Sequence, residues 1–356
     1  MHILVATDAW HPQINGVVRT LTAVEKAAAP LGVSFTFITP DDFRTVPLPG
    51  YPEIPLAVPN PRAIARRIAQ VKADAIHVAT EAPVGYFVRR HCVAHGLPFT
   101  TSFHTRLPDY VSARLPIPPR WTWNWLRRFH NAGIGVMAAT PALAAELDAR
   151  GFRNTMLWPR GVDTDLFKRR PDTDLALKRP VFLSVGRLAI EKNLDAFLGL
   201  DLPGTKVVVG DGPARAELEA RFPDAIFLGP QEGETLARTY AAADVFVFPS
   251  WTDTFGLVLL EALASGLPVA AFPVTGPLDV IGSAPVGVLA DDLRVAALSA
   301  LNVSPDACRA FALQHNWDES ARVFLDNIVR AGAAPYSPRQ QRMRVTSREE
   351  RPSVAA

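Results

Sequence analysis

The strongest constraint on the fold is a regular alternation of short apolar runs and helix-like segments. HILVAT (2–7) precedes GVVRTLTAVEKAAAP (16–30), and the same rhythm continues through the first half. It restarts at VFLSVG (181–186) and continues to PVAAF (268–272). Continuous apolar runs are typical of parallel strands buried on both faces, and helices between them serve as crossovers. The sequence therefore predicts an α/β protein with two doubly wound sheets, each covered by helices.

Length and linker composition predict how the chain is divided. Its 356 residues exceed one ordinary core, so we expect two domains of similar size. KRRPDTDLALKRP (168–180) is polar, contains two prolines and lacks periodicity, which is typical of a linker. The predicted parts are a first Rossmann-like domain (1–168), a linker (169–180), a second Rossmann-like domain (181–312), a helix that packs back on the first domain (313–330) and a disordered tail (331–356).

Composition excludes several classes of protein. Hydrophobic residues make up 48% and charged residues 20%, which indicates a globular chain. A net charge of +2 gives no reason to expect a nucleic-acid partner. Cys92 and Cys308 offer neither a disulfide framework nor metal spacing, so a reducing, cytoplasmic setting is expected. The N-terminus lacks the features of a signal peptide, and we expect no membrane span because no run of eighteen apolar residues occurs.

Two loops that follow predicted strands suit a phosphate group. Ligands of doubly wound sheets bind at the carboxyl ends of the strands. Gly16 lets the backbone approach a ligand at a helix N-terminus, although an ordinary Asn-Gly turn explains it equally well. In SVGRLAIEKN (184–193), Gly186 forms the turn, and Arg187 and Lys192 supply two cations that suit a diphosphate. Solvated surface charge is the alternative for this pair.

A pair of acids marks SWTDTFGLVLLEALASG (250–266). Asp253 stands at the start of a predicted apolar helix, and Glu261 follows eight residues later near the same face. Asp253 has the alternative role of a plain N-cap. Glu261 needs a polar partner because it stands among apolar neighbours, and sugar hydroxyls are one such partner.

Further polar candidates are less specific. VVVGDGPAR (207–215) lacks the third glycine of a dinucleotide fingerprint, so Gly212 is expected only to bring the backbone near a base or ribose. His104 and Glu81 stand at strand ends that face the same cleft. A lone histidine is more often a structural hydrogen-bonding group than a ligand contact.

Tryptophan and arginine interleave in residues 106–133, which suits the interfacial zone of an anionic bilayer. A helix that packs on the first domain with its basic side in water is an equal alternative. The prolines of LPIPPR (115–120) predict two short helical pieces rather than one. The acceptor or membrane candidates are Glu81, Arg106, Tyr110, Trp121, Trp123, Trp125, Arg127 and Arg128.

Taken together, these motifs resemble the family 4 glycosyltransferases of the GT-B fold over residues 1–330. DVFVFPSWTDTFGLVLLEALASGLPVAA (244–271) is similar to the two-acid E-x7-E segment of that family. NGVVRTL, FHTR, WPRGVDTDLF, SVGRLAIEKN and GDGP support the resemblance in the same order. It implies two Rossmann-like domains, of which the first (1–168) binds the acceptor and the second (181–312) binds the nucleotide sugar. It also implies a retaining transfer, without a required cofactor or a bound metal.

The resemblance also implies residue roles. Arg187 and Lys192 would neutralise the diphosphate, Glu261 would hold the ribose, and Gly16 would let the diphosphate approach. His104 would contact the donor sugar. Asp253 departs from the family's glutamate, which leaves its reach and the preferred sugar open. The implied catalytic residues are His104, Arg187, Lys192 and Asp253, and the implied donor-binding residues are Gly16, Gly186, Arg187, Lys192, Gly212, Asp253, Thr254, Phe255, Gly256, Leu257 and Glu261.

The acceptor segment is similar to that of bacterial glycosyl-diacylglycerol synthases and lipid-glycan mannosyltransferases. This implies transfer of a hexose or hexuronic acid from a UDP-sugar, such as UDP-glucose or UDP-glucuronate, to diacylglycerol at the inner face of the cell membrane. A GDP-mannose-dependent mannosyltransferase is the first alternative. A non-catalytic nucleotide-sugar binding module, an epimerase and a phosphorylase are alternatives of other classes, although no lysine stands in a convincing context for pyridoxal.

Overall fold

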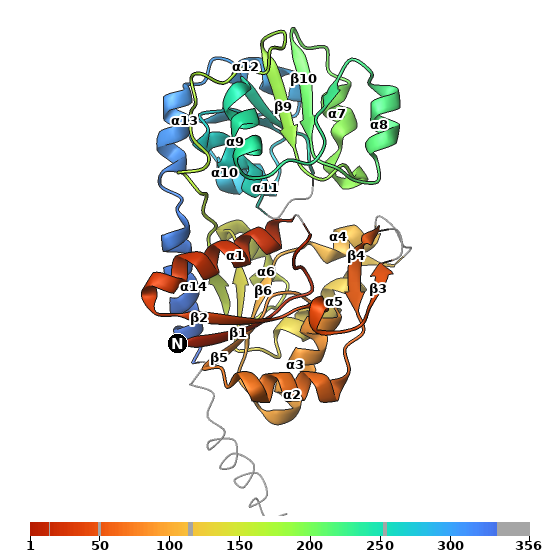
Figure 1. Ribbon diagram of the computed structural model, residues 1–356, viewed down its shortest axis with the longest axis vertical. Coiled ribbons are helices and arrows are strands. Elements are labelled where there is room, and N and C mark those ends of the chain that lie inside the picture. Colours follow the sequence, from red (N-terminus) through yellow and green to blue (C-terminus); the bar gives the residue numbers. More distant parts are fainter. Residues whose placement is uncertain (14, 49–50, 113–116, 252–254, 333–356) are drawn as a thin grey trace, which may run out of the picture.

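Two six-stranded parallel sheets form the molecule, one in each half of the chain (Figure 1). The computed structural model describes residues 1–13, 15–48, 51–112, 117–251 and 255–332, without the side chains of 48, 51–54 and 109–111. The prediction of two α/β sheets is confirmed. Bounds in the first sheet are β1 (His2–Ala6), β2 (Ser34–Ile38), β5 (Ala75–Val78), β6 (Thr100–Phe103), β7 (Gly135–Ala138) and β8 (Thr155–Leu157); those in the second are β9 (Val181–Val185), β10 (Thr205–Val209), β11 (Ile226–Phe227), β12 (Val245–Phe248), β13 (Val269–Ala271) and β14 (Gly287–Leu289).

Strand order places a switch point in each sheet. The first sheet runs β2-β1-β5-β6-β7-β8 and the second runs β11-β10-β9-β12-β13-β14, so the order reverses beside β1 and beside β9. A ligand of a doubly wound sheet binds outside the carboxyl ends of the strands at such a point. The loops after β1 and β9 are therefore the first places to look for a site.

Helices cover both faces of each sheet. The alternate residues Ile3 and Val5 of β1 pack with α1 and α14, whereas Leu4 and Ala6 pack with α2 and α3. In the first half the bounds are α1 (Gly16–Ala28), η1 (Ala29–Leu31), η2 (Pro40–Asp42), α2 (Pro61–Val71), α3 (Pro83–His95), α4 (Leu107–Ser112), α5 (Pro119–His130) and α6 (Pro141–Ala149); the later ones are η3 (Ile190–Lys192), α7 (Leu194–Leu198), α8 (Arg215–Arg221), α9 (Gly233–Ala242), α10 (Leu257–Ala264), α11 (Thr275–Val280), α12 (Leu293–Ala300), α13 (Pro305–Ala312) and α14 (Trp317–Arg330).

The chain crosses between the halves twice. Residues 158–180 carry no helix or strand and connect β8 to β9. After α13, the chain returns, and α14 lies against α1 of the first half (Figure 1). Trp158 Nε1 donates to Ser320 Oγ at 3.2 Å, and Asn327 Nδ2 donates to the Leu157 carbonyl at 2.8 Å. These bonds fasten the last helix to the first half of the chain, so both ends of the described chain belong to the same lobe.

Several elements go beyond the sequence predictions. The antiparallel hairpin of β3 (Thr45–Leu48) and β4 (Tyr51–Ala57) was not expected, nor were β8, β14, α11 and α12. The expected break at LPIPPR separates α4 from α5. The predicted tail from residue 333 onward lies outside the described residues. None of the helices in the described ranges has the length and hydropathy needed to cross a bilayer.

Candidate active site in the interdomain cleft

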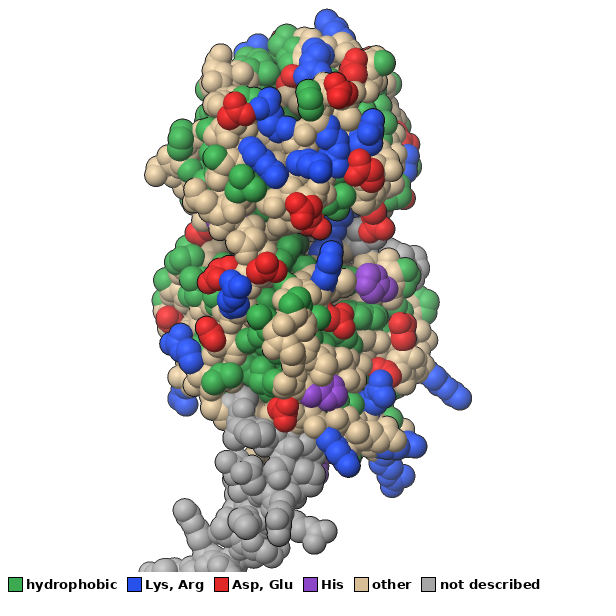
Figure 2. Space-filling model, turned by 60° about the vertical axis from the view of Figure 1, so that its left-hand side comes forward, with side chains coloured by type: hydrophobic (Ala, Val, Ile, Leu, Met, Phe, Trp, Pro, Cys, Tyr) green, Lys and Arg blue, Asp and Glu red, His purple; other side chains and the backbone are tan. Residues whose placement is uncertain are grey.

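Helices α1 and α10, from different lobes, face each other where the two lobes meet. Arg19 Nη1 of α1 lies 2.7 Å from Glu261 Oε1 of α10. A Cβ atom added to Gly16 would lie 3.8 Å from Leu257 Cδ1, so the helices also approach at their N-terminal ends. Figure 2 shows a constriction between the lobes, with Lys or Arg and Asp or Glu side chains interspersed on this face. The predicted residues Gly16, Leu257 and Glu261 are thus brought together.

Glu261 is a buried carboxylate with two protein partners. The residue is 6% exposed, and besides Arg19 it accepts a hydrogen bond from the Tyr240 hydroxyl, whose oxygen lies 3.1 Å from Oε2. The Glu261 carboxylate raises the pKa of the Arg19 guanidinium. The pKa of the Tyr240 hydroxyl is raised mainly by burial and, second, by the charge of Glu261. The polar partner required by an acid on an apolar helix is therefore present within the chain. Carboxylate oxygens retain further acceptor capacity for hydroxyl groups.

The N-termini of the two helices differ. The Asn15 side chain accepts hydrogen bonds from the backbone N–H groups of Val17 and Val18, both at 3.0 Å, so α1 is capped by its own chain. Helix α10 begins after Gly256, whose φ of +82° is in the left-handed region, and no side chain of the described residues caps it. The predicted residues Asp253 and Thr254 lie outside the described residues.

The cationic loop after β9 lies against the loop that leads into α10. Asn193 Nδ2 donates to the Pro249 carbonyl at 3.1 Å, and Ser250 Oγ donates to the Glu191 carbonyl at 3.4 Å. Arg187 and Lys192 are partly exposed on this loop. These two bonds bring the loop that carries Arg187 and Lys192 against residues 249–250, and the closeness of the two cations to the start of α10 stays a prediction.

The glycines of these loops are explained by different features of the structure. A Cβ atom at Gly186 would meet nothing within 4 Å, so the backbone there is open to a ligand. A Cβ at Gly212 would lie 2.3 Å from the Leu188 carbonyl oxygen, and one at Gly210 would lie 1.9 Å from that of Gly186. Loop packing alone therefore accounts for Gly210 and Gly212, whereas Gly186 remains available for a ligand.

His104 follows β6 and contacts a buried arginine. Arg160 Nη2 lies 3.3 Å from His104 Nδ1, and Arg160 Nη1 donates to the Trp158 carbonyl at 2.7 Å. The same guanidinium lies 4.1 Å from the centroid of the Trp158 ring. Burial and then the Arg160 charge lower the pKa of His104 well below its ordinary value, and burial lowers the pKa of Arg160 to about 9. Arg160 therefore stays protonated at neutral pH.

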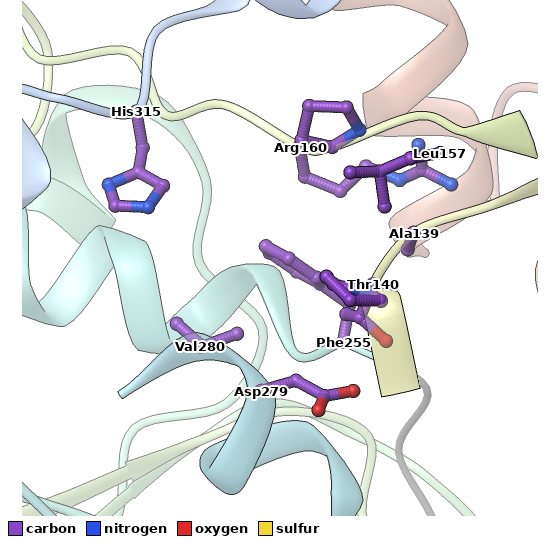
Figure 3. Close-up of a pocket in the computed structure, with 10 residues that line it drawn as sticks. Ala139, Thr140, Leu157, Arg160, Phe255, Asp279, Val280 and His315 are labelled. Carbon is purple, nitrogen blue, oxygen red and sulfur yellow. The ribbon is translucent and has the colours of Figure 1, made fainter. Parts of the chain in front are cut away.

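A small pocket of about 160 Å³ lies between the lobes beside Arg160. Figure 3 shows Arg160 and Leu157 on one side of it, with Phe255, Val280 and Asp279 on the other. The volume is below the roughly 300–1,000 Å³ that is usual for small-molecule sites. Its lining residues are Ala139, Thr140, Pro141, Leu157, Pro159, Arg160, Phe255, Asp279, Val280 and His315.

Three of the acceptor candidates make structural contacts. The Glu81 carboxylate lies 3.1 Å from His130 Nε2, and Arg106 makes two bonds to Glu146, at 2.7 and 3.1 Å. Trp123 is only 9% exposed and stacks on Phe103 at a centroid distance of 5.8 Å. The prediction that Trp123 contacts a membrane is therefore wrong, because the ring belongs to the core between α5 and its sheet. The side chain of Tyr110 lies outside the described residues.

The outer face of α5 remains aromatic and basic. Trp121 is 61% exposed and Trp125 is 39% exposed, and the exposed Arg120 and Arg128 lie on the same helix. Arg127 is partly exposed and donates to Asn124 Oδ1 at 3.3 Å. We call Arg120, Trp121, Trp125 and Arg128 the α5 face.

Sequence reasoning missed Arg19, Tyr240 and Arg160. Arg19 lies within NGVVRTL and Arg160 lies within WPRGVDTDLF, two of the motifs that carried the resemblance. Their partners are remote in sequence, since Glu261 is 242 positions from Arg19 and His104 is 56 positions from Arg160. Helical periodicity and loop composition give no signal for such contacts.

Family models match most of the chain. The model described as Glycosyltransferase Family 4 matches residues 14–166, and the model of glycosyl transferases group 1 matches residues 179–302. A GDP-mannose-dependent alpha-mannosyltransferase of Mycobacterium tuberculosis is 32% identical over 316 residues, covering 81% of this chain and 83% of that protein. Alpha-monoglucosyldiacylglycerol synthase of Streptococcus pneumoniae is 28% identical over 86% of this chain and 79% of that protein. Sulfoquinovosyl transferase SQD2 of Arabidopsis thaliana is 32% identical over 67% of this chain but only 50% of its own length.

Solved structures share the architecture. Anabaena HepE in complex with UDP and glucose has a TM-score of 0.67 at 16% identity, over 92% of this chain and 99% of that one. Sucrose-phosphate synthase from Thermosynechococcus elongatus has a TM-score of 0.69 at 18% identity, over 98% and 99% of the two chains. At these identities the likeness supports the two-domain fold alone.

Proposed function

This chain belongs to glycosyltransferase family 4, and we propose on that premise that it transfers a hexose or hexuronic acid from a nucleotide sugar to a membrane lipid. Diacylglycerol is the favoured acceptor, and UDP-glucose or UDP-glucuronate is the favoured donor. The supporting observations are the contact of Arg19 with Glu261 across the boundary between the lobes and the contact of the loop of Arg187 and Lys192 with residues 249–250, which precede α10.

The proposed donor pose follows from the charges of this arrangement. The diphosphate would lie between the cations of the β9 loop and the first amides of α10, because both favour an anion. Glu261 would accept hydrogen bonds from the ribose hydroxyls while Arg19 and Tyr240 hold its carboxylate. Gly16 and Gly186 would allow close approach of the backbone, since neither position has an atom closer than 3.8 Å to an added Cβ.

The proposed reaction retains the configuration at the anomeric carbon. The bond from the anomeric carbon to the diphosphate oxygen breaks, and its electron pair leaves with the nucleoside diphosphate. The acceptor hydroxyl forms the new bond on the same face and passes its proton to the departing diphosphate oxygen. Arg187 and Lys192 would stabilise negative charge that is larger in the transition state than in the bound donor.

The lipid acceptor rests on the α5 face. Exposed Trp121 and Trp125 next to Arg120 and Arg128 suit the headgroup region of an anionic bilayer, where aromatic rings and cations both lie favourably. The relation to a monoglucosyldiacylglycerol synthase supports the same acceptor class. We propose that the enzyme binds the inner face of the cell membrane through this face.

A GDP-mannose donor is the second candidate. Three relatives named GDP-mannose-dependent alpha-mannosyltransferase are 30–32% identical over 81–82% of this chain. Their names favour mannosyl transfer from GDP-mannose, and in this second proposal the acceptor is a lipid or a glycan.

One transfer assay tests the reaction and the donor. Purified protein is incubated with UDP-glucose, UDP-glucuronate or GDP-mannose and with vesicles that contain diacylglycerol, and glycolipid products are measured by mass spectrometry. We expect one donor to give a glycosyl lipid whose formation is lost in Glu261→Ala. Donor binding without nucleotide release from any sugar would instead indicate a non-catalytic binding module.

A vesicle assay tests the membrane contact separately. We expect sedimentation with anionic vesicles to weaken by about tenfold in Trp121→Ser/Trp125→Ser, because two interfacial aromatic side chains are removed. The matched control is Val295→Ser/Leu301→Ser, which removes apolar groups of 50% and 39% exposure at and just after α12 in the second half. Equal vesicle binding of both variants would contradict the proposed role of the α5 face.

A further inference from the structure

Arg160 is a buried cation that the proposed reaction does not use. The residue is 4% exposed, and the contacts that locate its guanidinium are the Trp158 carbonyl, the Trp158 ring and His104 Nδ1. The carbonyl and the ring account for holding the side chain in place. The contact with His104 has a consequence of its own, because it fixes the chemical state of the imidazole.

Arginine donates hydrogen bonds and has no acceptor atom. At 3.3 Å, the bond between Arg160 Nη2 and His104 Nδ1 therefore requires a lone pair on Nδ1. A histidine with an unprotonated Nδ1 is neutral and carries its proton on Nε2. An imidazolium would turn an N–H group toward the guanidinium and place two positive charges side by side.

We propose that Arg160 is a positioning residue that holds His104 as the neutral Nε2–H tautomer. His104 would then serve the donor sugar as a hydrogen-bond donor through Nε2–H and would act as neither a general acid nor a general base. The second half of this inference rests on the proposed glycosyl transfer, whereas the tautomer does not.

The surroundings of His104 act in the same direction. Burial is the largest cause of its lowered pKa, followed by the charge of Arg160 and then by His77 and His130. His77 is bonded to Thr100 and Ser102 in the buried sheet. His130 is bonded to Thr101 and to the carboxylate of Glu81. The Glu81 carboxylate is thus engaged by His130.

A neutral donor suits the proposed reaction. In a retaining transfer the departing diphosphate takes the acceptor proton, so a histidine that protonated the diphosphate would compete with that step. An Nε2–H group can bond a hydroxyl of the sugar without giving up its proton. His104 would therefore orient the sugar, and the rate should not depend on its titration.

Nitrogen NMR of histidine-labelled protein tests the tautomer without requiring activity. The His104 signals are assigned by their loss in His104→Gln. We expect Nδ1 to show the chemical shift of an unprotonated nitrogen and Nε2 that of a protonated one. We also expect no imidazolium at pH 6.5, where an ordinary histidine is about half protonated. A protonated Nδ1 in the wild-type protein would overturn the proposal.

Two substitutions of Arg160 test whether its guanidinium sets the tautomer of His104. Arg160→Met removes both donor and charge, so we expect mixed tautomers and a titration of His104 shifted toward the ordinary range. Arg160→Lys keeps a charged donor and should retain the Nε2–H form. If the two variants titrate alike, or if Arg160→Met leaves the spectrum unchanged, Arg160 does not set the tautomer. Should Arg160→Met fail to fold, Arg160→Gln removes the charge in its place, and a His104 titration unchanged from the wild-type protein would then overturn the role of Arg160.

Arg309 provides a matched control. Its guanidinium bonds the backbone carbonyls of Thr164, Phe167 and Ala264, and it is also partly buried at the crossing between the lobes. Arg309→Met should leave the His104 signals unchanged. A transfer assay of the wild-type protein then separates the two proposals: absence of transfer contradicts the proposed function, whereas the NMR result tests the tautomer by itself.

Discussion

The two walls of the interdomain cleft are each built on the start of a helix, but the helices begin differently. On the first-half wall, Asn15 caps α1 by accepting the N–H groups of Val17 and Val18. On the second-half wall, α10 starts at Gly256 without a side-chain cap from the described residues, and the loop of Arg187 and Lys192 adjoins it through Pro249 and Ser250. The first wall satisfies its own donors, whereas the second presents amides and cations.

This difference suggests different roles for the two walls in binding the donor. Within the described residues no side chain caps α10, and a helix N-terminus with nearby cations favours a phosphate ligand, so we propose that the second wall holds the donor. The first wall supplies Arg19, which reaches across to Glu261. We infer that the first wall closes on the donor and orders the carboxylate, while the second wall holds the charge that develops during transfer.

The largest expected effect concerns the second wall. Arg187→Ala and Lys192→Ala should each lower turnover by about 10²–10³-fold, because each removes a cation that stabilises the departing diphosphate. The free energy of unfolding should change little, since both side chains are partly exposed. Initial rates at saturating donor and urea titrations measure the two quantities. Lys178→Ala, at an exposed position of the crossing segment, is the control. Near-normal turnover in both loop variants would contradict the proposed role of the second wall in stabilising the diphosphate.

Breaking the contact between the walls should have the next largest effect. Arg19→Met should lower the free energy of unfolding by about 1.5–3 kcal/mol, because a hydrogen bond between charged groups is lost and Glu261 stays buried. The donor KM should rise as well. Arg221→Met is the control, since its pair with Asp195 at 2.6 Å is about half exposed and lies within the second half. An exposed pair contributes about 0–1 kcal/mol, so equal losses in both variants would contradict a special role for Arg19.

Acid should weaken the first half of the chain, because burial lowers the pKa of His77, His91 and His104 there. Burial lowers the pKa of His77 to about 3. In the unfolded chain the His77 imidazole becomes protonated near pH 6.5, whereas in the folded chain it stays neutral until about pH 3. The free energy of unfolding therefore falls as the pH falls from 6.5 toward 3. The loss should reach about 2 kcal/mol at pH 5.

Urea titrations of the wild-type protein and His77→Gln at pH 7.5 and pH 5 measure how much His77 contributes to the pH dependence of the free energy of unfolding. The substitution keeps a donor and an acceptor for Thr100 and Ser102 but has no titrating nitrogen. The difference between the two proteins should shrink by about 2 kcal/mol on acidification. Asp8, whose pKa is raised by burial, acts with the opposite sign in both proteins and so cancels. An unchanged difference would mean that His77 binds a proton as readily in the folded chain as in the unfolded chain, so that its pKa is not lowered.

The sheet of the second half could be predicted well because its strands are continuous apolar runs. Phe182 and Leu183 pack into clusters on opposite faces, and both faces are covered, so the run has no polar interruption. The edge strand β14 could not be predicted, since Gly287–Leu289 is three residues long and only partly buried. Short edge strands lack both the length and the pattern that a sequence reader needs.

The site was predictable where one segment carried the signal. Glu261 was recognisable as an acid within an apolar helix, but Arg19 was not, because a contact across the lobes has no local pattern. Trp123 shows a different failure. Trp121 and Trp125 are four positions apart and share a face, while Trp123 lies about 200° away from Trp121 around the helix. Helical spacing alone would have placed it toward the core.

The smallest expected effect is that of removing the Asn15 cap of α1, and it tests directly whether the two walls differ. Asn15→Ala should lower the free energy of unfolding by about 1 kcal/mol through loss of the α1 cap. Asn60→Ala is the matched control, because Asn60 caps α2 in the same way by accepting the N–H groups of Arg62 and Ala63. The two variants should therefore be destabilised alike in the absence of a donor.

Addition of a nucleotide sugar should then separate the two cap variants. Loss of Asn15 releases two N–H groups at the cleft, and a diphosphate that reaches them would bond them in place of the side chain. The donor should then raise the melting temperature of Asn15→Ala more than that of Asn60→Ala, because α1, unlike α2, begins at the cleft. Equal shifts would mean that the diphosphate never touches the first wall. The donor phosphates would then be held by the second wall alone, and α1 would act only through Arg19.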